Sequence, residues 1–255
     1  MKLLVWNDGR VVEATDYTPP RAYVYQRIHT LGYKPYNLSR HIMLLREASA
    51  AMFGFMSLCR VEDAENIISK LLELSRVSRH LSCAVTMRLD PKGVLSFEVE
   101  APSLYAGSSL RAKRPKGALL QVPGLTDYHQ TAVTLANDTM NDCRVEGFGD
   151  VAICVDDKGE VISLPWRPLF AVYHNKIYTP CEYGSVEYVI AAEAIATAGF
   201  ELAIHPLPVD SLRRMDEIFL VDVMGITSLH SIEHHHLLYM VTSQVADRMK
   251  PKIGD

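Results

Sequence analysis

The segment Gly159–Pro180, GEVISLPWRPLFAVYHNKIYTP, has the clearest local pattern in this chain. It begins soon after an apolar run, Val151–Val155, which is typical of a buried strand. Within the segment, the short apolar run Leu169–Val172 is followed by the polar reversal His174–Lys176 and then by Ile177–Thr179. The closing proline cannot continue a strand. The segment therefore predicts two short antiparallel strands joined by a tight turn.

Composition is that of an ordinary globular protein with room for a real core. The 255 residues are 48% hydrophobic and 22% charged, which suits one large domain or two small ones. A net charge of −4 gives no sign of nucleic-acid binding, and no apolar run approaches the roughly 20 residues that cross a bilayer. The N-terminal residues become polar too soon for a signal peptide, and the five cysteines are odd in number and widely spaced. We therefore expect a cytoplasmic protein with reduced thiols.

Strand and helix patterns alternate along the rest of the chain. Amphipathic periodicity predicts helices over residues 40–52, 61–78, 131–144, 184–198 and 237–249. Ser39 is the predicted N-cap of the first helix. Apolar or alternating runs predict strands at residues 2–6, 10–13, 22–31, 82–89, 94–100, 119–122 and 200–204. The order predicts an α/β (α+β) fold with a small N-terminal domain, residues 1–118, and a large C-terminal domain, residues 119–255.

The order of residue types in Gly159–Pro180 is similar to that of the class IV aminotransferases. These fold-type IV enzymes of pyridoxal 5'-phosphate (PLP) include branched-chain and D-amino-acid aminotransferases and aminodeoxychorismate lyase. The consensus sequence of this family in the same segment is roughly G-x-V-x-E-x-x-x-x-N-x-F-x-V-x-x-x-x-L-x-T-P. The chain matches it without a gap at six framework positions, Gly159, Val161, Phe170, Val172, Thr179 and Pro180.

The N-terminal part resembles the same family. The family's consensus sequence there is V-F-E-T-I-R followed by G-K-P-F-x-L-x-x-H-L-x-R-L. In this chain it aligns with Val24–His29, then with Lys34–Tyr36, Leu38 and His41. The resemblance therefore covers nearly the whole chain. It implies a small N-terminal α/β domain, a larger C-terminal pseudo-barrel domain, a cleft between them, and a homodimer in which the partner subunit completes the cleft.

The positions that carry the chemistry in this family are changed here. The family's glutamate falls on Ser163, its asparagine on Pro168, and the arginine of the first helix on Leu44. The Schiff-base lysine would fall within residues 127–131, yet the sequence has no lysine between Lys116 and Lys158.

The two phosphate-binding turns of the family are changed as well. The first, G-I-T-R, stands here as GSVE over Gly184–Glu187. The second, T-G-T, stands as VDV over Val221–Val223, with Asp222 at its centre. Glu187 and Asp222 thus place negative charge where the resemblance implies a phosphate.

PLP chemistry needs a lysine for the imine, a carboxylate on the ring nitrogen and cationic or N–H donors on the phosphate. Because all of these positions are changed, we predict a class IV aminotransferase-like protein without PLP imine chemistry. It would bind a small ligand or act as a regulatory homologue, and no cofactor is expected. The alternative is a working PLP-dependent aminotransferase or lyase with relocated anchors, for instance Lys113 or Lys116. A third reading is a different enzyme with His129 as its base.

Five polar or aromatic residues are candidates to line a reshaped cleft. Tyr25, Arg27 and His29 come from the predicted strand 22–31, and His129 and Gln130 replace the lysine neighbourhood. Together they could bind a small acidic or aromatic ligand. The other interpretation of the same residues is surface and interface packing.

The run His230–His234 spells H-x-x-E-H, which binds zinc when it lies on a helix. Here it follows a strand-like segment and continues into His235 and His236 without helical spacing. A third ligand is not defined. We therefore predict no metal site and a polar edge or a subunit contact instead.

Overall fold

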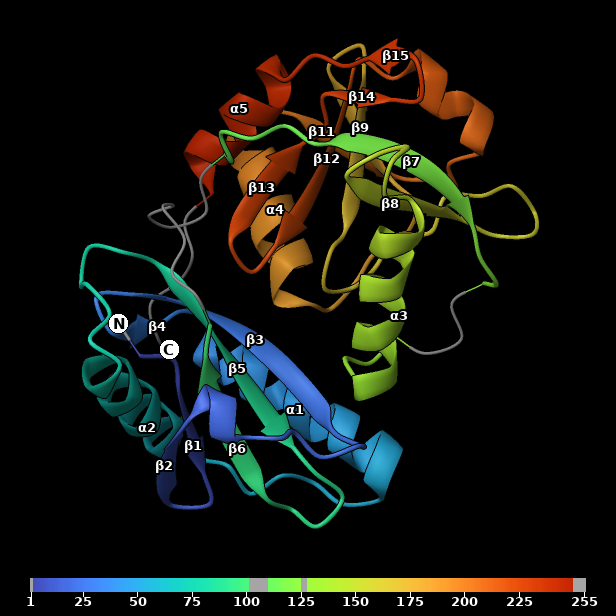
Figure 1. The fold of residues 1–255 in the computed structure, drawn as a ribbon. Helices are drawn as coiled ribbons and strands as arrows, with labels where there is room; N and C mark the ends of the chain where they lie inside the picture. Colours follow the sequence, from blue (N-terminus) through green and yellow to red (C-terminus); the bar gives the residue numbers. More distant parts are fainter. Residues whose placement is uncertain (1, 101–109, 125–127, 250–255) are drawn as a thin grey trace. The chain divides into compact units, whose positions relative to one another are not determined.

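The computed structural model describes residues 2–100, 110–124 and 128–249, and they form two compact units (Figure 1). The first unit contains residues 2–100 and His129–Leu135, and the second contains residues 110–124, Tyr128 and residues 136–249. Residues 110–118, which the sequence places in the small domain, therefore group with the second unit. The α/β class is confirmed.

A six-stranded sheet with the order β2-β1-β6-β5-β3-β4 forms the first unit. Its strands are β1 (Leu4–Asn7), β2 (Arg10–Glu13), β3 (Val24–Leu31), β4 (Lys34–Pro35), β5 (Cys83–Leu89) and β6 (Leu95–Val99). All neighbours in this sheet are antiparallel. Successive side chains on a strand point to opposite faces, so one face of this sheet can be apolar while the other is polar.

The apolar face packs against helices α1 (Leu38–Phe53) and α2 (Val61–Leu74). Ile28, Val85 and Phe97 of the sheet share one core with Leu45 and Leu72 of the helices, and each is at most 1% exposed. The helices form for the reason that the sequence indicates, since their apolar residues recur at helical spacing.

The predicted N-cap of α1 is wrong. The cap residue is Asn37, which has φ of 54° and makes no capping hydrogen bond with its side chain, so Ser39 lies inside the helix. Asparagine adopts this left-handed conformation more readily than most residues. The helix ends as expected from sequence rules, because Gly54 has φ of 75° and its N–H donates to the Ala50 carbonyl oxygen.

The second unit contains two sheets. A five-stranded sheet has the order β11-β10-β9-β12-β13, and a four-stranded sheet has the order β15-β14-β7-β8. The first consists of β9 (Leu169–Tyr173), β10 (Lys176–Thr179), β11 (Glu201–Ile204), β12 (Glu217–Asp222) and β13 (Gly225–Ser228). The second consists of β7 (Lys116–Gln121), β8 (Val151–Val155), β14 (Ser231–Ile232) and β15 (His235–His236). The helices are α3 (Ala132–Arg144), of which residues 132–135 belong to the first unit, α4 (Val186–Thr197) and α5 (Met240–Arg248).

The hairpin predicted from Gly159–Pro180 is confirmed as β9 and β10. They pair antiparallel from Tyr173 and Lys176 onward. His174 and Asn175 between them have φ of 48° and 63°. Two consecutive positive φ values match a two-residue type I′ turn, whose twist suits a hairpin.

Strand β12 and helix α5 are joined by a buried carboxylate. Glu217 is 2% exposed, and its oxygens accept the backbone N–H groups of Val241 and Thr242 at 2.8 and 2.7 Å. The Thr242 hydroxyl donates to it as well, at 2.7 Å. Glu217 therefore satisfies N–H donors at the start of α5 that have no backbone acceptor within the helix.

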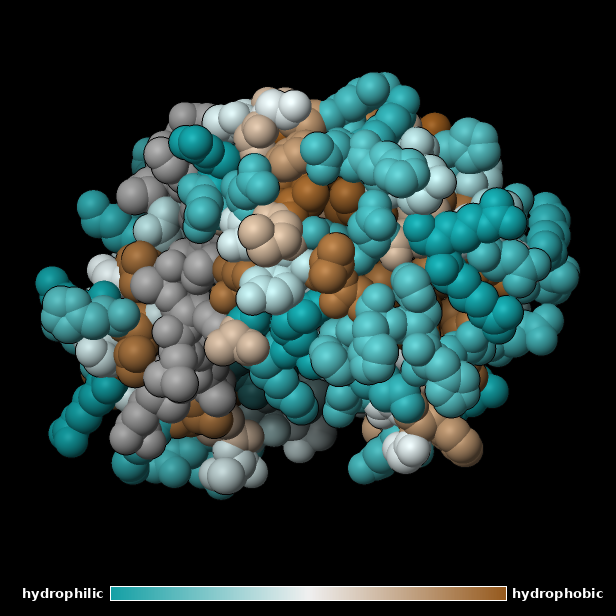
Figure 2. Space-filling view, turned by 90° about the horizontal axis from the view of Figure 1, so that it is seen from above, coloured by the Kyte–Doolittle hydropathy of each residue, from teal (hydrophilic) through white to brown (hydrophobic). Residues whose placement is uncertain are grey.

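Hydrophilic residues predominate on the face shown in Figure 2, and hydrophobic residues show in small areas between them. Among the described residues, no helix combines the length and the apolar character that crossing a membrane requires.

Candidate functional site

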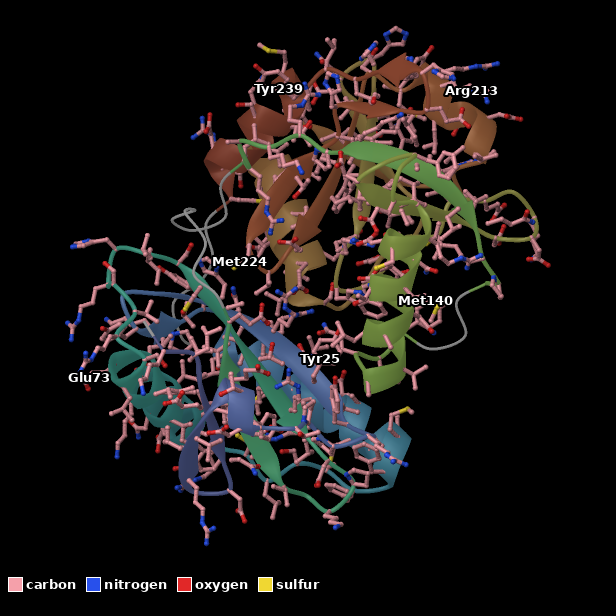
Figure 3. All side chains as sticks on the ribbon, in the orientation of Figure 1. Tyr25, Glu73, Met140, Arg213, Met224 and Tyr239 are labelled. Atoms are coloured by element: carbon pink, nitrogen blue, oxygen red, sulfur yellow. The ribbon has the colours of Figure 1, made fainter. Side chains whose placement is uncertain are left out.

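Three of the five predicted cleft residues lie on one face of β3. Tyr25, Arg27 and His29 alternate along the strand, so their side chains share the face opposite the helices. Tyr25 is labelled in Figure 3, and it is 1% exposed, while His29 is 6% exposed. The ring of His29 lies 5.4 Å from that of Tyr36, measured between centroids. The structure thus brings these three residues together.

The other two candidates, His129 and Gln130, lie beside the start of the same strand. The N–H of Tyr25 donates to the carbonyl oxygen of Gln130 at 2.8 Å, and the N–H of Ala132 donates to that of Tyr23 at 3.0 Å. The segment thus extends the edge of β3, and the first turn of α3 follows at once. The sequence could not show this, because the contact joins residues about a hundred positions apart.

Arg27 is engaged by a carboxylate that sequence reasoning missed. Its Nε donates to Glu100 Oε1 at 2.9 Å and its second nitrogen to Oε2 at 2.5 Å, which is a bidentate pair. The Thr86 hydroxyl also donates to Glu100. Burial alone would raise the pKa of Glu100, but the hydrogen bonds and charge of Arg27 outweigh it and hold that pKa below its usual value. An acidic ligand would therefore have to compete with Glu100 for Arg27.

Ser163, at the family's glutamate position, is committed to local structure. It is 2% exposed, and its hydroxyl oxygen accepts the N–H of Leu169 at 3.0 Å. Its carbonyl oxygen accepts the hydroxyl of Tyr183 at 2.7 Å. Burial raises the pKa of Tyr183, so this phenol stays protonated and donates. Ser163 carries no charge with which to hold a protonated pyridine nitrogen.

Asp222, at the second phosphate turn, is the last residue of β12 in the tight turn to β13. Its Oδ1 accepts the N–H of Met224, a residue labelled in Figure 3, at 2.7 Å. The same oxygen accepts a nitrogen of Arg111 at 2.7 Å. The Asp222 carboxylate therefore accepts hydrogen bonds from a guanidinium and a backbone N–H, the two kinds of donor that a bound phosphate would need. Two unit charges of like sign about 5 Å apart repel by roughly 3 kcal/mol at an effective dielectric of about 20.

The first phosphate turn, at the start of α4, also contains side-chain acceptors for the N–H groups at this end of the helix. The hydroxyl of Ser185 accepts the N–H of Tyr188 at 3.3 Å and caps the helix. Glu187 follows in the first turn and is 5% exposed. Its negative charge complements the positive end of the helix dipole. Leu44, at the family's arginine position, is a half-buried apolar residue of α1 and supplies no charge.

The positions that the resemblance assigns to the PLP lysine, carboxylate and arginine carry other residues in this sequence. Of the segment where this lysine would stand, residues 125–127 lie outside the described part of the chain, but the sequence has no lysine from residue 117 to residue 157. The two lysines proposed as replacements are at the surface. Lys113 has an 80% exposed side chain that lies 3.8 Å from Asp150, and Lys116 is exposed at the start of β7.

Trp166 and Arg167, which follow Ser163, join this loop to α3. Arg167 pairs with Asp138 at 2.5 Å and with Asp142 at 2.8 Å, and Trp166 Nε1 donates to Asp138 at 3.2 Å. The Arg167 side chain is 15% exposed, so this ion-pair cluster is largely buried.

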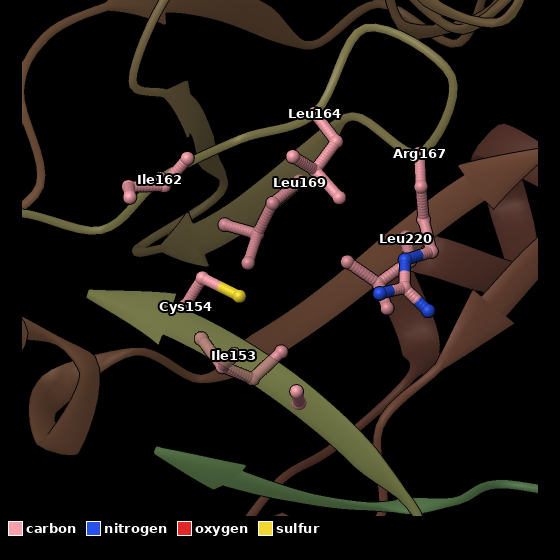
Figure 4. A pocket seen from close by; sticks show the side chains of 8 residues that line it. Ile153, Cys154, Ile162, Leu164, Arg167, Leu169 and Leu220 are labelled. Carbon is pink, nitrogen blue, oxygen red and sulfur yellow. The ribbon is translucent and has the colours of Figure 1, made fainter. Parts of the chain in front are cut away.

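A small pocket beside this cluster is drawn in Figure 4. Leu169, Leu220 and Cys154 line it with Arg167, and it has room for about one water molecule. Burial raises the pKa of Cys154 to about 11, so the thiol is not poised for reaction. The pocket is far smaller than a cofactor site.

The H-x-x-E-H run lies in the β14–β15 hairpin and not on a helix. Glu233 occupies the turn with φ of 50° and pairs with Arg213 at 3.0 Å. Nε2 of His235 lies 2.9 Å from the Met215 carbonyl oxygen. Within the described ranges, no three His, Cys, Asp or Glu side chains are grouped as a metal site would require.

Comparison with known proteins identifies the family of this chain. The family model described as amino-transferase class IV matches residues 24–232. Comparison with curated protein sequences gave no significant match.

Solved structures of low sequence identity share the fold. A branched-chain aminotransferase from Thermoproteus uzoniensis, solved with norvaline, has a TM-score of 0.77 and 17% identity, covering 97% of this chain and 94% of that one. An aminotransferase from Brucella abortus, solved with bound PLP, has a TM-score of 0.78 and 14% identity, covering 98% of each chain. The Escherichia coli branched-chain amino acid aminotransferase has a TM-score of 0.72 and 15% identity, covering 93% and 88%. The two-unit α/β architecture is thus the fold-type IV architecture, and the chain belongs to the class IV aminotransferase family.

Proposed function

We propose that this member of the class IV aminotransferase family has lost PLP imine chemistry and acts as a small-ligand-binding or regulatory protein. No cofactor is part of the proposal. The observation that carries it is Asp222, whose carboxylate accepts from both Arg111 and the Met224 N–H where the resemblance implies a phosphate. The neutral, buried Ser163 and the lysine-free stretch between Lys116 and Lys158 support the same conclusion.

Borohydride reduction followed by mass spectrometry of the intact protein tests this proposal. Borohydride fixes an imine between PLP and a lysine as a stable adduct. After incubation with excess PLP, free PLP is removed by gel filtration before reduction, because it also labels exposed lysines. We then expect no stoichiometric adduct, and a proteolytic digest should yield no single lysine peptide that carries PLP in most of the protein. A genuine aminotransferase treated in parallel shows that the reduction worked.

The second candidate is an active PLP-dependent aminotransferase or lyase with relocated anchors. Family membership favours it, and so does the fold shared with a Brucella abortus aminotransferase that was solved with PLP. It requires a lysine outside the usual place, so the Lys113→Ala or the Lys116→Ala variant should lose bound cofactor. If both variants keep it, neither lysine is the anchor.

The proposed ligand is small and acidic or aromatic, and its proposed place is the face of β3 with Tyr25, Arg27 and His29. Because Glu100 occupies Arg27, an anionic ligand must displace it. The Glu100→Gln variant should therefore bind benzoate more tightly than the unchanged protein in a calorimetric titration. Glu98→Gln, which alters the neighbouring pair with Arg88, is the matched control and should leave the affinity unchanged.

We also propose, from the family resemblance, that the protein is a homodimer and is cytoplasmic. Sedimentation equilibrium tests the first statement, because a single species at the monomer mass over a wide concentration range would contradict it. Cell fractionation tests the second.

A further inference from the structure

The turn between β12 and β13 gathers two donors on one oxygen atom. The guanidinium of Arg111 and the backbone N–H of Met224 each donate to Oδ1 of Asp222 at 2.7 Å. A guanidinium and a backbone N–H that converge on one point are the donors with which proteins commonly bind oxyanions such as phosphate. Here the point is occupied by an oxygen of the chain itself.

Both donors are held in place by the sheet. The N–H of Arg111 donates to the Ile226 carbonyl oxygen at 2.9 Å, so its backbone is fixed beside β13. Asp222 pairs with Gly225 at the end of β12, which fixes the turn that carries Met224. The side chains of Arg111 and Asp222 are 26% and 21% exposed, so the ion pair is partly accessible to solvent and to a small anion.

We propose that Asp222 is a built-in anion that closes an oxyanion site made by Arg111 and the β12–β13 turn. Removal of its charge should open this site to inorganic phosphate. This inference deepens the proposed function and rests on it, because both assume that the Asp222 carboxylate occupies the place where the resemblance implies a phosphate.

The Asp222→Asn substitution is the direct test. Asparagine has nearly the same shape without the charge, and its amide oxygen can accept the Met224 N–H when no anion is present, so the turn should be kept. A neutral amide is a weaker acceptor than a carboxylate, so phosphate should displace it from the Met224 N–H and from Arg111. We expect inorganic phosphate to bind this variant at least tenfold more tightly than the unchanged protein, as measured by calorimetry at constant ionic strength. Phosphate should also raise the urea midpoint of the variant but not that of the unchanged protein.

Two further variants show where the phosphate binds. Arg111→Gln added to Asp222→Asn should abolish the gain, because the guanidinium is then missing. Glu233→Gln is the control, because it releases another arginine of the same unit, Arg213, whose nitrogen lies 3.0 Å from the Glu233 carboxylate. No backbone N–H is described beside that pair, so this variant should bind phosphate no better than the unchanged protein. Circular dichroism confirms that each variant is folded, and Asp222→Ser replaces Asp222→Asn if the latter is not.

The outcomes separate this inference from the proposed function. A folded Asp222→Asn or Asp222→Ser protein without tighter phosphate binding overturns the inference, whatever the borohydride experiment shows. A gain that survives Arg111→Gln, or appears equally in Glu233→Gln, overturns it as well. A lysine adduct with PLP in the unchanged protein would instead remove the proposed function, even if the phosphate result stands.

Discussion

Each of the two units contains an arginine that is neutralised by a carboxylate far away in the sequence, but the two pairs differ in geometry. In the first unit, Arg27 and Glu100 are bidentate across the sheet, with Thr86 as a third partner. In the second unit, Arg111 and a backbone N–H share a single oxygen of Asp222. The first pair joins strands to one another, whereas the second fills a turn. The first should therefore matter more for stability and the second more for ligand choice.

The largest expected effect is that of Glu100→Ala. The substitution leaves Arg27 and Thr86 without the carboxylate, and hydrogen bonds to charged groups contribute about 1.5–3 kcal/mol each. Because both side chains of the pair are partly exposed, we expect a total loss of about 2–3 kcal/mol in the free energy of unfolding, measured by urea denaturation. An unchanged urea midpoint would show that the pair is not structural. Glu13→Ala, which alters the exposed pair with Lys2, is the control and should cost under about 1 kcal/mol.

The same pair predicts a pH dependence. The pKa of Glu100 is held below its usual value of 4.5 in the folded protein, because Arg27 and Thr86 stabilise the carboxylate. A lowered folded pKa means that the stabilisation is complete above the unfolded pKa and is lost as the pH falls through the folded pKa. Unfolding free energies measured from neutral pH to about pH 3 should therefore fall less steeply in Glu100→Gln than in the unchanged protein. Parallel curves would contradict the assignment.

A smaller effect is expected for Asp222→Asn. One charged hydrogen bond is lost while the Met224 N–H keeps an acceptor, so we expect a loss of about 1 kcal/mol in phosphate-free buffer. A loss as large as that of Glu100→Ala would mean that Asp222 holds the sheet together, and the contrast between the two pairs would fail.

The smallest effect is expected for His129→Ala. His129 contributes its carbonyl oxygen, which accepts the Thr134 hydroxyl at 3.1 Å, and a substitution of the side chain leaves this bond intact. The free energy of unfolding should change by less than about 1 kcal/mol and by less than in Asp222→Asn, and any benzoate binding should persist. Loss of ligand binding or turnover in this variant would favour the third reading, in which His129 is a base.

Local features of this fold could be predicted from the sequence, because neighbouring residues determine them. The β9–β10 hairpin follows from its turn residues His174 and Asn175, and the helices follow from their apolar spacing. The N-cap of α1 could not, since both Asn37 and Ser39 are good cap residues and only the backbone path decides between them.

The site was only partly predictable. The absence of lysine and the presence of Asp222 can be read directly from the sequence. The partners of Arg27 and Asp222 cannot, because they lie 73 and 111 residues away and depend on strand register. The neutralisation of both arginines therefore emerged only with the fold.

The most direct test of the central claim is the mass of the intact, unchanged protein after incubation with excess PLP and reduction with borohydride. With free PLP removed before reduction, we predict mainly the unmodified mass and no lysine peptide labelled stoichiometrically, while the aminotransferase control is labelled at one lysine. A stoichiometric PLP adduct on any single lysine would contradict the account.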